Sequence, residues 1–150
     1  MSLGCNLFFF SVKEELRGGR MNYTIALFGE AQKGKFCFPY EIKHLSQLAE
    51  SLGNPPKDSL GLYFAIQALL YDRKLIYIRV KEEGFSTNDY LKGFHHLKNP
   101  DKFPKLNAIG LPNVGDHIIL DATYPLCVLH KSLLLTTEKD LYDYLTCRGK

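Results

Sequence analysis

Hydrophobic and polar positions follow two different periods along most of the chain. Short apolar runs rich in β-branched and aromatic residues predict strands, because such side chains suit a buried pleated sheet. Longer stretches with apolar residues every three or four positions predict helices. We therefore expect strands at residues 23–28, 75–80, 106–110 and 132–136. We expect helices at residues 40–52, 58–70, 87–97, 116–124 and 137–145.

Helix-capping and helix-breaking residues give these elements their predicted ends. Gly53 is typical of the position after a helix. Asp58 or Ser59 is expected to cap the second helix through its side-chain oxygen, and Thr137 to cap the last one. Pro125 is expected to kink or restart the helix that begins near residue 116, because proline lacks a backbone N–H.

Strands and helices alternate along the chain without an internal repeat or a flexible linker. This order predicts a single three-layer α/β domain, with a mostly parallel sheet of four or five strands flanked by helices on both faces. We assign residues 21–150 to this domain. Residues 1–20 end in a Glu/Arg/Gly-rich string before Met21, typical of a translated ribosome-binding site. We expect them to be a non-native or disordered extension, the alternative being a short amphipathic helix at residues 11–17.

Composition adds limits rather than a function. The chain has 150 residues, 45% of them hydrophobic and 23% charged, which excludes disordered and collagen-like classes. The net charge of +3 is too small to predict nucleic-acid binding by itself. The apolar run at residues 7–10 is far shorter than the roughly 20 residues of a membrane helix, so we expect no membrane partner. The scattered cysteines, without a CxxC pair or an export signal, predict reduced thiols and a cytoplasmic location; they are Cys5, Cys37, Cys127 and Cys147.

Loops after the carboxyl ends of parallel strands are the usual place for ligands. One hypothesis is therefore a small cytoplasmic enzyme or ligand-binding domain with a crevice at that edge. The loop 29–34 departs from both common phosphate-binding patterns, since Phe36 follows Lys35 where a hydroxyl residue is required. The polar residues that we expect around the crevice are Glu30, Lys33, Asn113, Asp116 and Thr137.

Two constellations resemble catalytic or metal sites, and each fits a plainer structural role. Cys127 and His130 have the spacing of a thiolate–imidazole pair, but apolar neighbours favour a buried thiol and a histidine at a helix end. Asp116, His117 and Asp121 can ligate a metal, yet the same residues are typical of an acidic helix start. We expect no catalytic residues, no cofactor and no metal.

Exposed aromatic residues are common anchors of protein interfaces. The loop 99–105 is expected to expose an aromatic side chain at its tip, and the last helix carries two tyrosines. A contact with nucleic acid is the less favoured interpretation of this loop, because no nucleic-acid recognition fold accompanies it. The interface candidates are Lys102, Phe103, Tyr142 and Tyr144.

The order of several short motifs is also informative. A strand ends in Leu27–Ala31, a loop with Gly34 and Pro39 follows, and a helix closes on Gly53. A second, buried helix at 60–70 then leads into the strand Tyr77–Val80, which ends in Arg-Val. The later segments follow at 90–97, 106–112, 116–130 and 132–136. In the order and spacing of these segments, residues 23–136 resemble the subunits of contractile phage-tail sheaths and related contractile injection systems.

This resemblance implies a non-enzymatic structural or assembly protein that acts by self-association or partner binding. The chain departs from the family pattern at Tyr71–Arg73, where sheath subunits often have Asn-Gly-Gly, and it is shorter than a typical subunit. The alternative is the small cytoplasmic enzyme or ligand-binding domain described above.

Overall fold

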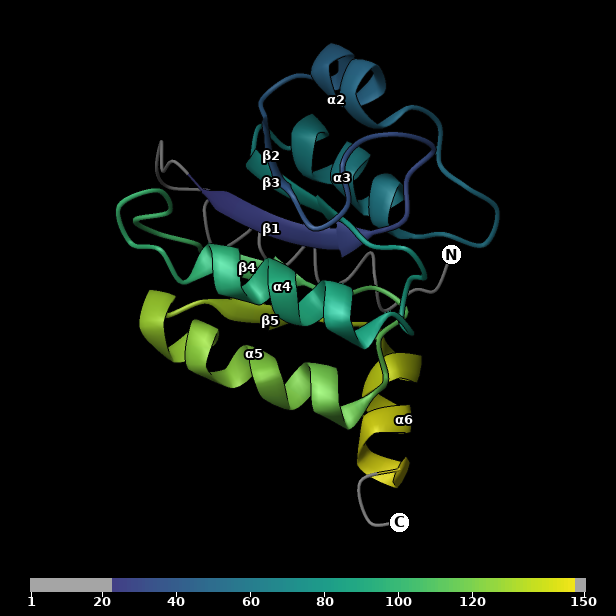
Figure 1. The fold of residues 1–150 in the computed structure, drawn as a ribbon, viewed down its shortest axis with the longest axis vertical. Coiled ribbons are helices and arrows are strands. Elements are labelled where there is room, and N and C mark those ends of the chain that lie inside the picture. The colour runs from purple at the N-terminus through teal and green to yellow at the C-terminus, as the bar shows by residue number, and fades with distance from the viewer. Residues whose placement is uncertain (1–22, 148–150) are drawn as a thin grey trace.

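Five strands and five helices make up residues 23–147, the part of the chain that the computed structural model describes (Figure 1). The strands are Thr24–Gly29 (β1), Pro39–Ile42 (β2), Lys74–Arg79 (β3), Ala108–Gly110 (β4) and Leu133–Leu135 (β5). The helices are Leu45–Leu52 (α2), Gly61–Leu70 (α3), Thr87–Leu97 (α4), His117–His130 (α5) and Glu138–Cys147 (α6). The expected extension at 1–20 lies outside the described residues.

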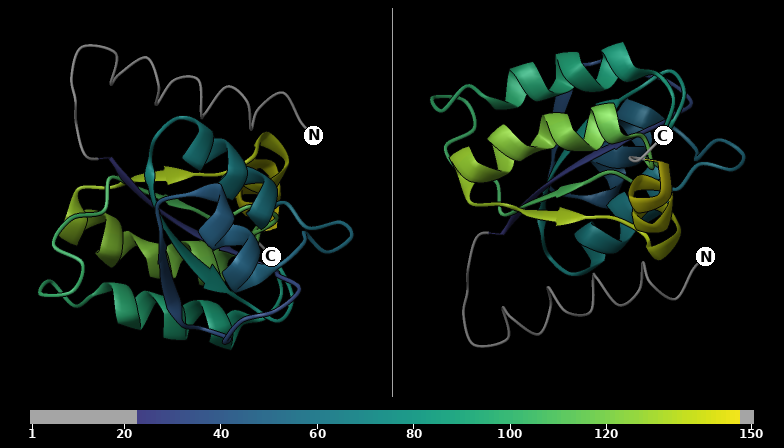
Figure 2. Two further views of the ribbon diagram at one scale, coloured as in Figure 1. Left: turned by 90° about the horizontal axis from the view of Figure 1, so that it is seen from above. Right: turned by 90° about the horizontal axis from the view of Figure 1, so that it is seen from below.

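The strands form one sheet in the order β2-β3-β1-β4-β5. β1 pairs in parallel with β3 and β4, and β5 continues the parallel set, whereas β2 is antiparallel to β3. Helices α2 and α3 cover one face, and α4 and α5 cover the other (Figure 2). The prediction of a three-layer α/β domain with a mostly parallel sheet is confirmed.

The central strand β1 shows why both faces need a helical layer. Ile25 and Leu27 point to the cluster under α2 and α3, whereas Ala26 and Phe28 point to the cluster under α4 and α5. All four side chains are completely buried. A strand buried on both sides reads as a continuous apolar run, which is why its position was evident from the sequence.

The start of α3 packs directly on the end of β1 at two glycines. A Cβ atom added to Gly61 would lie 2.8 Å from the Cα of Gly29 and 2.9 Å from Oε1 of Glu83. No side chain larger than hydrogen fits there without movement of the backbone. This contact brings the first turn of α3 to the carboxyl edge of the sheet.

The predicted helix at residues 40–52 is wrong in its first part, because residues 39–42 form β2. Pro39 and Ile42 are buried while Glu41 is exposed, and this short segment pairs with the outer edge of β3. The helix begins only at Leu45, where the Gln47 side chain accepts hydrogen bonds from the backbone N–H groups of residues 43 and 44.

Helix α5 is longer than the sequence predicted. It begins beside Asp116, whose side chain accepts from the N–H of Ile118 at 2.7 Å, and continues through Pro125 to His130. Pro125 lies on the exposed side of the helix, where the missing N–H leaves a carbonyl that water can reach. None of the helices between residues 23 and 147 combines the length and the apolar character that a membrane crossing requires.

Candidate functional site

An open crevice of about 670 Å³ lies where β1, β3 and β4 end and α6 begins. Seven carboxylates and two lysines line it, so its surface is predominantly acidic. This is the edge at which parallel sheets usually bind ligands. What the crevice can do depends on whether these carboxylates are free.

Glu83 is the central side chain of the crevice and is 4% exposed. Its carboxylate accepts from the backbone N–H groups of Leu60 at 2.7 Å and Gly61 at 2.9 Å, and from the hydroxyl of Ser59 at 3.3 Å. These N–H groups belong to the first turn of α3 and have no partner within the helix. The expectation that Asp58 or Ser59 caps this helix is therefore wrong: a carboxylate distant in the sequence binds its first turn.

The same carboxylate connects three strand ends. Glu30 and Glu83 bond reciprocally: the N–H of Glu30 donates to Oε1 of Glu83 at 3.2 Å, and the N–H of Glu83 donates to Oε2 of Glu30 at 3.0 Å. The side-chain amide of Asn113 donates to Oε2 of Glu83 at 2.6 Å, and its N–H donates to Asp140 at 2.9 Å. The loops after β1, β3 and β4 and the start of α6 thus form one hydrogen-bonded unit, which we call the Glu83 network.

Burial dominates the electrostatics of this unit. Burial raises the pKa of Glu83, while the hydrogen bonds from Leu60, Asn113, Gly61 and Glu30 lower it. Burial likewise raises the pKa of Asp140, against hydrogen bonds that lower it.

Tyr77 lies beneath the same loops. Burial, and then the nearby carboxylate of Glu83, hold the pKa of the Tyr77 phenol well above its usual value. The hydroxyl therefore stays protonated and donates to the carbonyl of Glu30 at 2.9 Å. Glu30, Glu83 and Asp140, three of the seven carboxylates of the crevice, are thus used in holding loops together, as are Asn113 and Tyr77.

The structure brings three of the five predicted crevice residues together. Glu30, Asn113 and Asp116 line the cavity. Lys33 does not: its side chain is exposed, and its N–H donates to the carbonyl of Leu52 at the end of α2. The prediction that Lys33 lies in the crevice is wrong, because the loop after β1 turns away toward α2.

Thr137 does not line the crevice either, because it is buried. It acts instead as the predicted cap of α6, since its hydroxyl accepts from the N–H of Asp140 at 3.0 Å. Glu83 was missed, although the loop 81–86 was recognisable as one that follows a strand. A single acidic residue in a charged loop gives no signal that it will be buried. Its role depends on the first turn of α3, which only the fold places beside it.

The metal and thiol hypotheses are not supported by the geometry. Among residues 23–147 no three His, Cys, Asp or Glu side chains gather into a group that could hold a metal ion. Asp121 accepts from the hydroxyl of Tyr144 at 2.7 Å. His130 is buried with Nε2 at 2.8 Å from the carbonyl oxygen of Leu97, and burial raises the pKa of the Cys127 thiol, so the two do not form a reactive pair.

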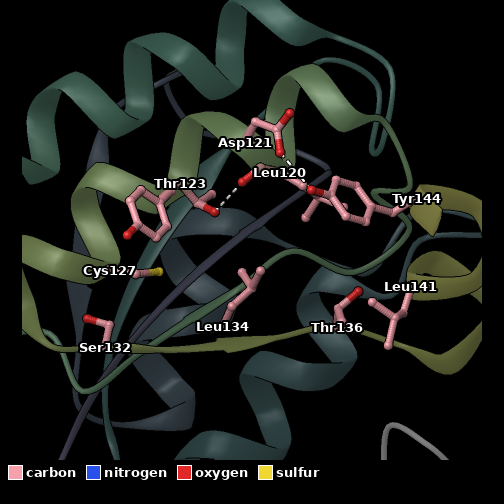
Figure 3. Close-up of a pocket in the computed structure, with 10 residues that line it drawn as sticks. Leu120, Asp121, Thr123, Cys127, Ser132, Leu134, Thr136, Leu141 and Tyr144 are labelled. Atoms are coloured by element: carbon pink, nitrogen blue, oxygen red, sulfur yellow. Dashed lines mark hydrogen bonds between the residues drawn. The ribbon is translucent and has the colours of Figure 1, made fainter. Parts of the chain in front are cut away.

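A second cavity, of about 560 Å³, lies between α5, β5 and α6 (Figure 3). We call it the α5–α6 groove. It is lined by Leu120, Asp121, Thr123, Tyr124, Cys127, Ser132, Leu134, Thr136, Leu141 and Tyr144. Tyr124 is 72% exposed, and Leu141 is also exposed. β5 pairs only with β4, so within residues 23–147 its outer edge has no neighbouring strand.

Of the two tyrosines predicted as contacts, Tyr142 is 67% exposed and Tyr144 is half-buried. Tyr142 shares its exposed side of α6 with Leu141 and Leu145, which are spaced to lie on one helix face. Leu141 also lines the α5–α6 groove, so this face adjoins the groove at the β5 side of the molecule.

A third cavity, of about 500 Å³, lies between the loop before β2 and the outer face of α4. We call it the basic aromatic groove. Its lining combines lysine and histidine with apolar side chains: Lys35, Phe36, Phe38, Leu91, Lys92, His95 and His96 are among its residues. The guanidinium of Arg79 lies 4.0 Å from the centre of the Phe36 ring, and the Lys35 ammonium lies 5.5 Å from that of Phe38.

The loop 99–105 meets this groove in a way that corrects one prediction. Lys102 is exposed, and its ammonium lies 5.7 Å from the Phe38 ring. Phe103 was expected at an exposed tip, but it is 2% exposed and packs in the core below α4 and α5. The N–H of Phe103 donates to the carbonyl of Asn99, so the loop turns back and buries the ring.

Cys37, which also lines this groove, is a poor nucleophile, because burial and then Asp89 raise its thiol pKa to about 11.

Residues 23–147 thus form an α/β domain whose crevice is held by the Glu83 network and whose helices α5 and α6 carry exposed apolar side chains. Comparison with known proteins adds no relative: no family model, no curated protein and no solved structure matches this chain.

Proposed function

We propose that this protein is a non-enzymatic assembly protein that acts by self-association through its β5 side. The observation that carries the proposal is the set of exposed apolar side chains on the neighbouring helices α5 and α6, namely Tyr124, Val128, Leu141, Tyr142 and Leu145, each at least 45% exposed. Large exposed apolar patches mark interaction sites.

The hydrogen bonds in the crevice favour this proposal over an enzymatic function. Its central carboxylate accepts five hydrogen bonds, and those bonds hold loops in place. A general acid or base needs a lone pair or proton free to meet a substrate. The resemblance to sheath-type subunits, whose work is assembly, points to the same function, and the scattered cysteines support a reducing, cytoplasmic setting.

The test is the molar mass in solution, measured by light scattering after size-exclusion chromatography over a wide range of protein concentration. We expect oligomers that dissociate on dilution. The variant Leu141→Ser/Leu145→Ser should be monomeric throughout, with an unchanged circular dichroism spectrum, because both side chains are exposed. A wild-type protein that remains monomeric at every concentration would overturn the proposal.

A further inference from the structure

We infer that copies of this chain associate head to tail, with the exposed face of α6 from one copy seated in the basic aromatic groove of the next. This inference rests on the proposed self-association and names its geometry.

The two surfaces lie at opposite edges of the sheet. The groove is built from the loop before β2 and from α4, on the β2–β3 side. Helix α6 contacts α5 and lies beyond the β5 side (Figure 1). A copy can therefore use both surfaces at once, one toward each neighbour.

The exposed face of α6 begins with one carboxylate, Glu138, whose side chain is exposed. Asp140 is buried in the Glu83 network and Asp121 is bonded to Tyr144, so neither belongs to this face. Along the exposed face of α6, Glu138 precedes Leu141, Tyr142 and Leu145, and the spacing of three and four residues places all four on one stripe. The face thus presents a carboxylate at one end and apolar side chains along the rest.

The groove has the complementary character. Lys35, Lys92, His95 and His96 are exposed in its lining, with Lys102 nearby. Asp89 beside the groove is buried and accepts from the N–H of Lys81 at 2.9 Å and from the Cys37 thiol. Three exposed lysines, Lys35, Lys92 and Lys102, outnumber this buried carboxylate.

Apolar surface is present on both partners as well. Phe36, Phe38 and Leu91 in the groove are each at least 40% exposed. Leucine and tyrosine side chains from α6 would cover them, while Glu138 would meet a lysine of α4. An interface that combines aromatic anchors with opposite charges at its rim is the usual arrangement of specific protein contacts.

Such a contact joins two different surfaces, so it does not close into a twofold dimer. Repetition of one heterologous contact gives either a ring or an open chain of copies. The charges also make the association weaker at high ionic strength, because salt screens exposed ion pairs.

The decisive experiment mixes two blocked variants. A groove-blocked variant, Lys92→Glu/His96→Glu, keeps an intact α6 face, and a tail-blocked variant, Leu141→Ser/Leu145→Ser, keeps an intact groove. We expect each alone to be monomeric, with association weakened about tenfold or more. Their mixture should give a one-to-one heterodimer by light scattering, because one complete interface remains.

Two controls separate this geometry from a general effect of charge and from misfolding. Lys33→Glu repeats the lysine-to-glutamate reversal of the groove-blocked variant on a loop away from the groove, and it should assemble as wild type. Circular dichroism melts check folding, and Leu91→Ser offers a groove variant without a change of charge, which should weaken association as well.

The outcomes distinguish the inference from the proposed function. Wild-type protein that never associates overturns both. Wild-type oligomers that persist in the groove-blocked variant, or a mixture that stays monomeric, overturn the head-to-tail inference alone. A labelled oligothymidine is titrated in parallel; if it binds the wild type and not the groove-blocked variant, while assembly is unaffected, the groove is a nucleic-acid site and the inference is wrong.

Discussion

The crevice at the carboxyl ends of the strands and the exposed surfaces at the two sides of the sheet use polar and apolar residues in opposite ways. In the crevice, polar side chains such as Glu83 are buried and bonded to backbone groups of neighbouring loops. At the sides, apolar residues such as Leu145 and Phe38 are exposed beside charged ones. The charged residues of the Glu83 network thus stabilise the loops around the crevice, and we propose that binding uses the apolar side chains that remain exposed.

The largest expected effect concerns the Glu83 network. Glu83→Ala removes the acceptor of five hydrogen bonds and leaves buried N–H groups at the start of α3 without a partner. We expect the free energy of unfolding to fall by about 3–5 kcal/mol, measured by urea denaturation. The matched control is Glu82→Ala, an exposed neighbour, which should change it by less than about 0.5 kcal/mol. Equal effects of the two variants would show that the buried carboxylate of Glu83 stabilises the fold no more than an exposed one does.

A somewhat smaller loss is expected at the contact between α3 and β1. Gly61→Ala places a methyl group 2.8 Å from the Cα of Gly29 and against the hydroxyl of Tyr77. Overpacking of this kind costs about 1–3 kcal/mol, which thermal and urea unfolding should both detect. Unchanged stability would show that the first turn of α3 can move, and hence that Glu83 is held less rigidly than the crevice requires.

The pH dependence of stability tests the state of Glu83 more finely. Because its folded-state pKa is raised above the ordinary value of 4.5, the folded protein takes up a proton before the unfolded chain does. This group therefore makes the unfolding free energy rise as the pH falls through the folded-state pKa toward 4.5, and fall again as the pH rises. The difference between wild type and Glu83→Gln, measured from about pH 7 to about pH 5, isolates this contribution.

The opposite trend, with wild type losing stability relative to Glu83→Gln on acidification, would mean that the five donors outweigh burial. The fold would then stabilise Glu83 as a buried anion. The crevice would differ even more from the exposed sides of the sheet, where charged side chains face solvent.

The smallest effect on stability is expected at the β5 side. Tyr142→Ser changes a side chain that is 67% exposed, so the free energy of unfolding should change by less than about 0.5 kcal/mol. Association, measured by light scattering, should nevertheless weaken. A large loss of stability would place Tyr142 in the fold itself and would weaken the division between the two kinds of region.

Much of the fold could be predicted because its signals are local. The apolar run of β1, the buried helix α3 and the cap Thr137 each depend on residues close together in the sequence. These local signals failed where a contact with residues distant in the sequence determines the structure of a segment. β2 is four residues long and pairs with β3, and the loop around Phe103 is held by burial of that ring. Neither partner is visible in a local pattern.

The candidate site divides in the same way. Glu30, Asn113 and Asp116 were predictable because each follows a parallel strand, and such strands end at one edge. Lys33 was placed wrongly, since the direction of a loop depends on contacts such as the one with Leu52. Glu83 was missed because a carboxylate is buried only when donors surround it, and those donors come from a helix more than twenty residues away.

By itself, the sequence determined the layers of this protein, since hydrophobic periodicity is a property of neighbouring residues. It also determined that the chain is rich in aromatic and charged residues. The tertiary structure alone decided which of them are buried and which remain exposed. Burial and hydrogen bonding depend on what the fold brings together, and this is why the acidic crevice became part of the scaffold while α6 and the basic aromatic groove stayed open on opposite sides.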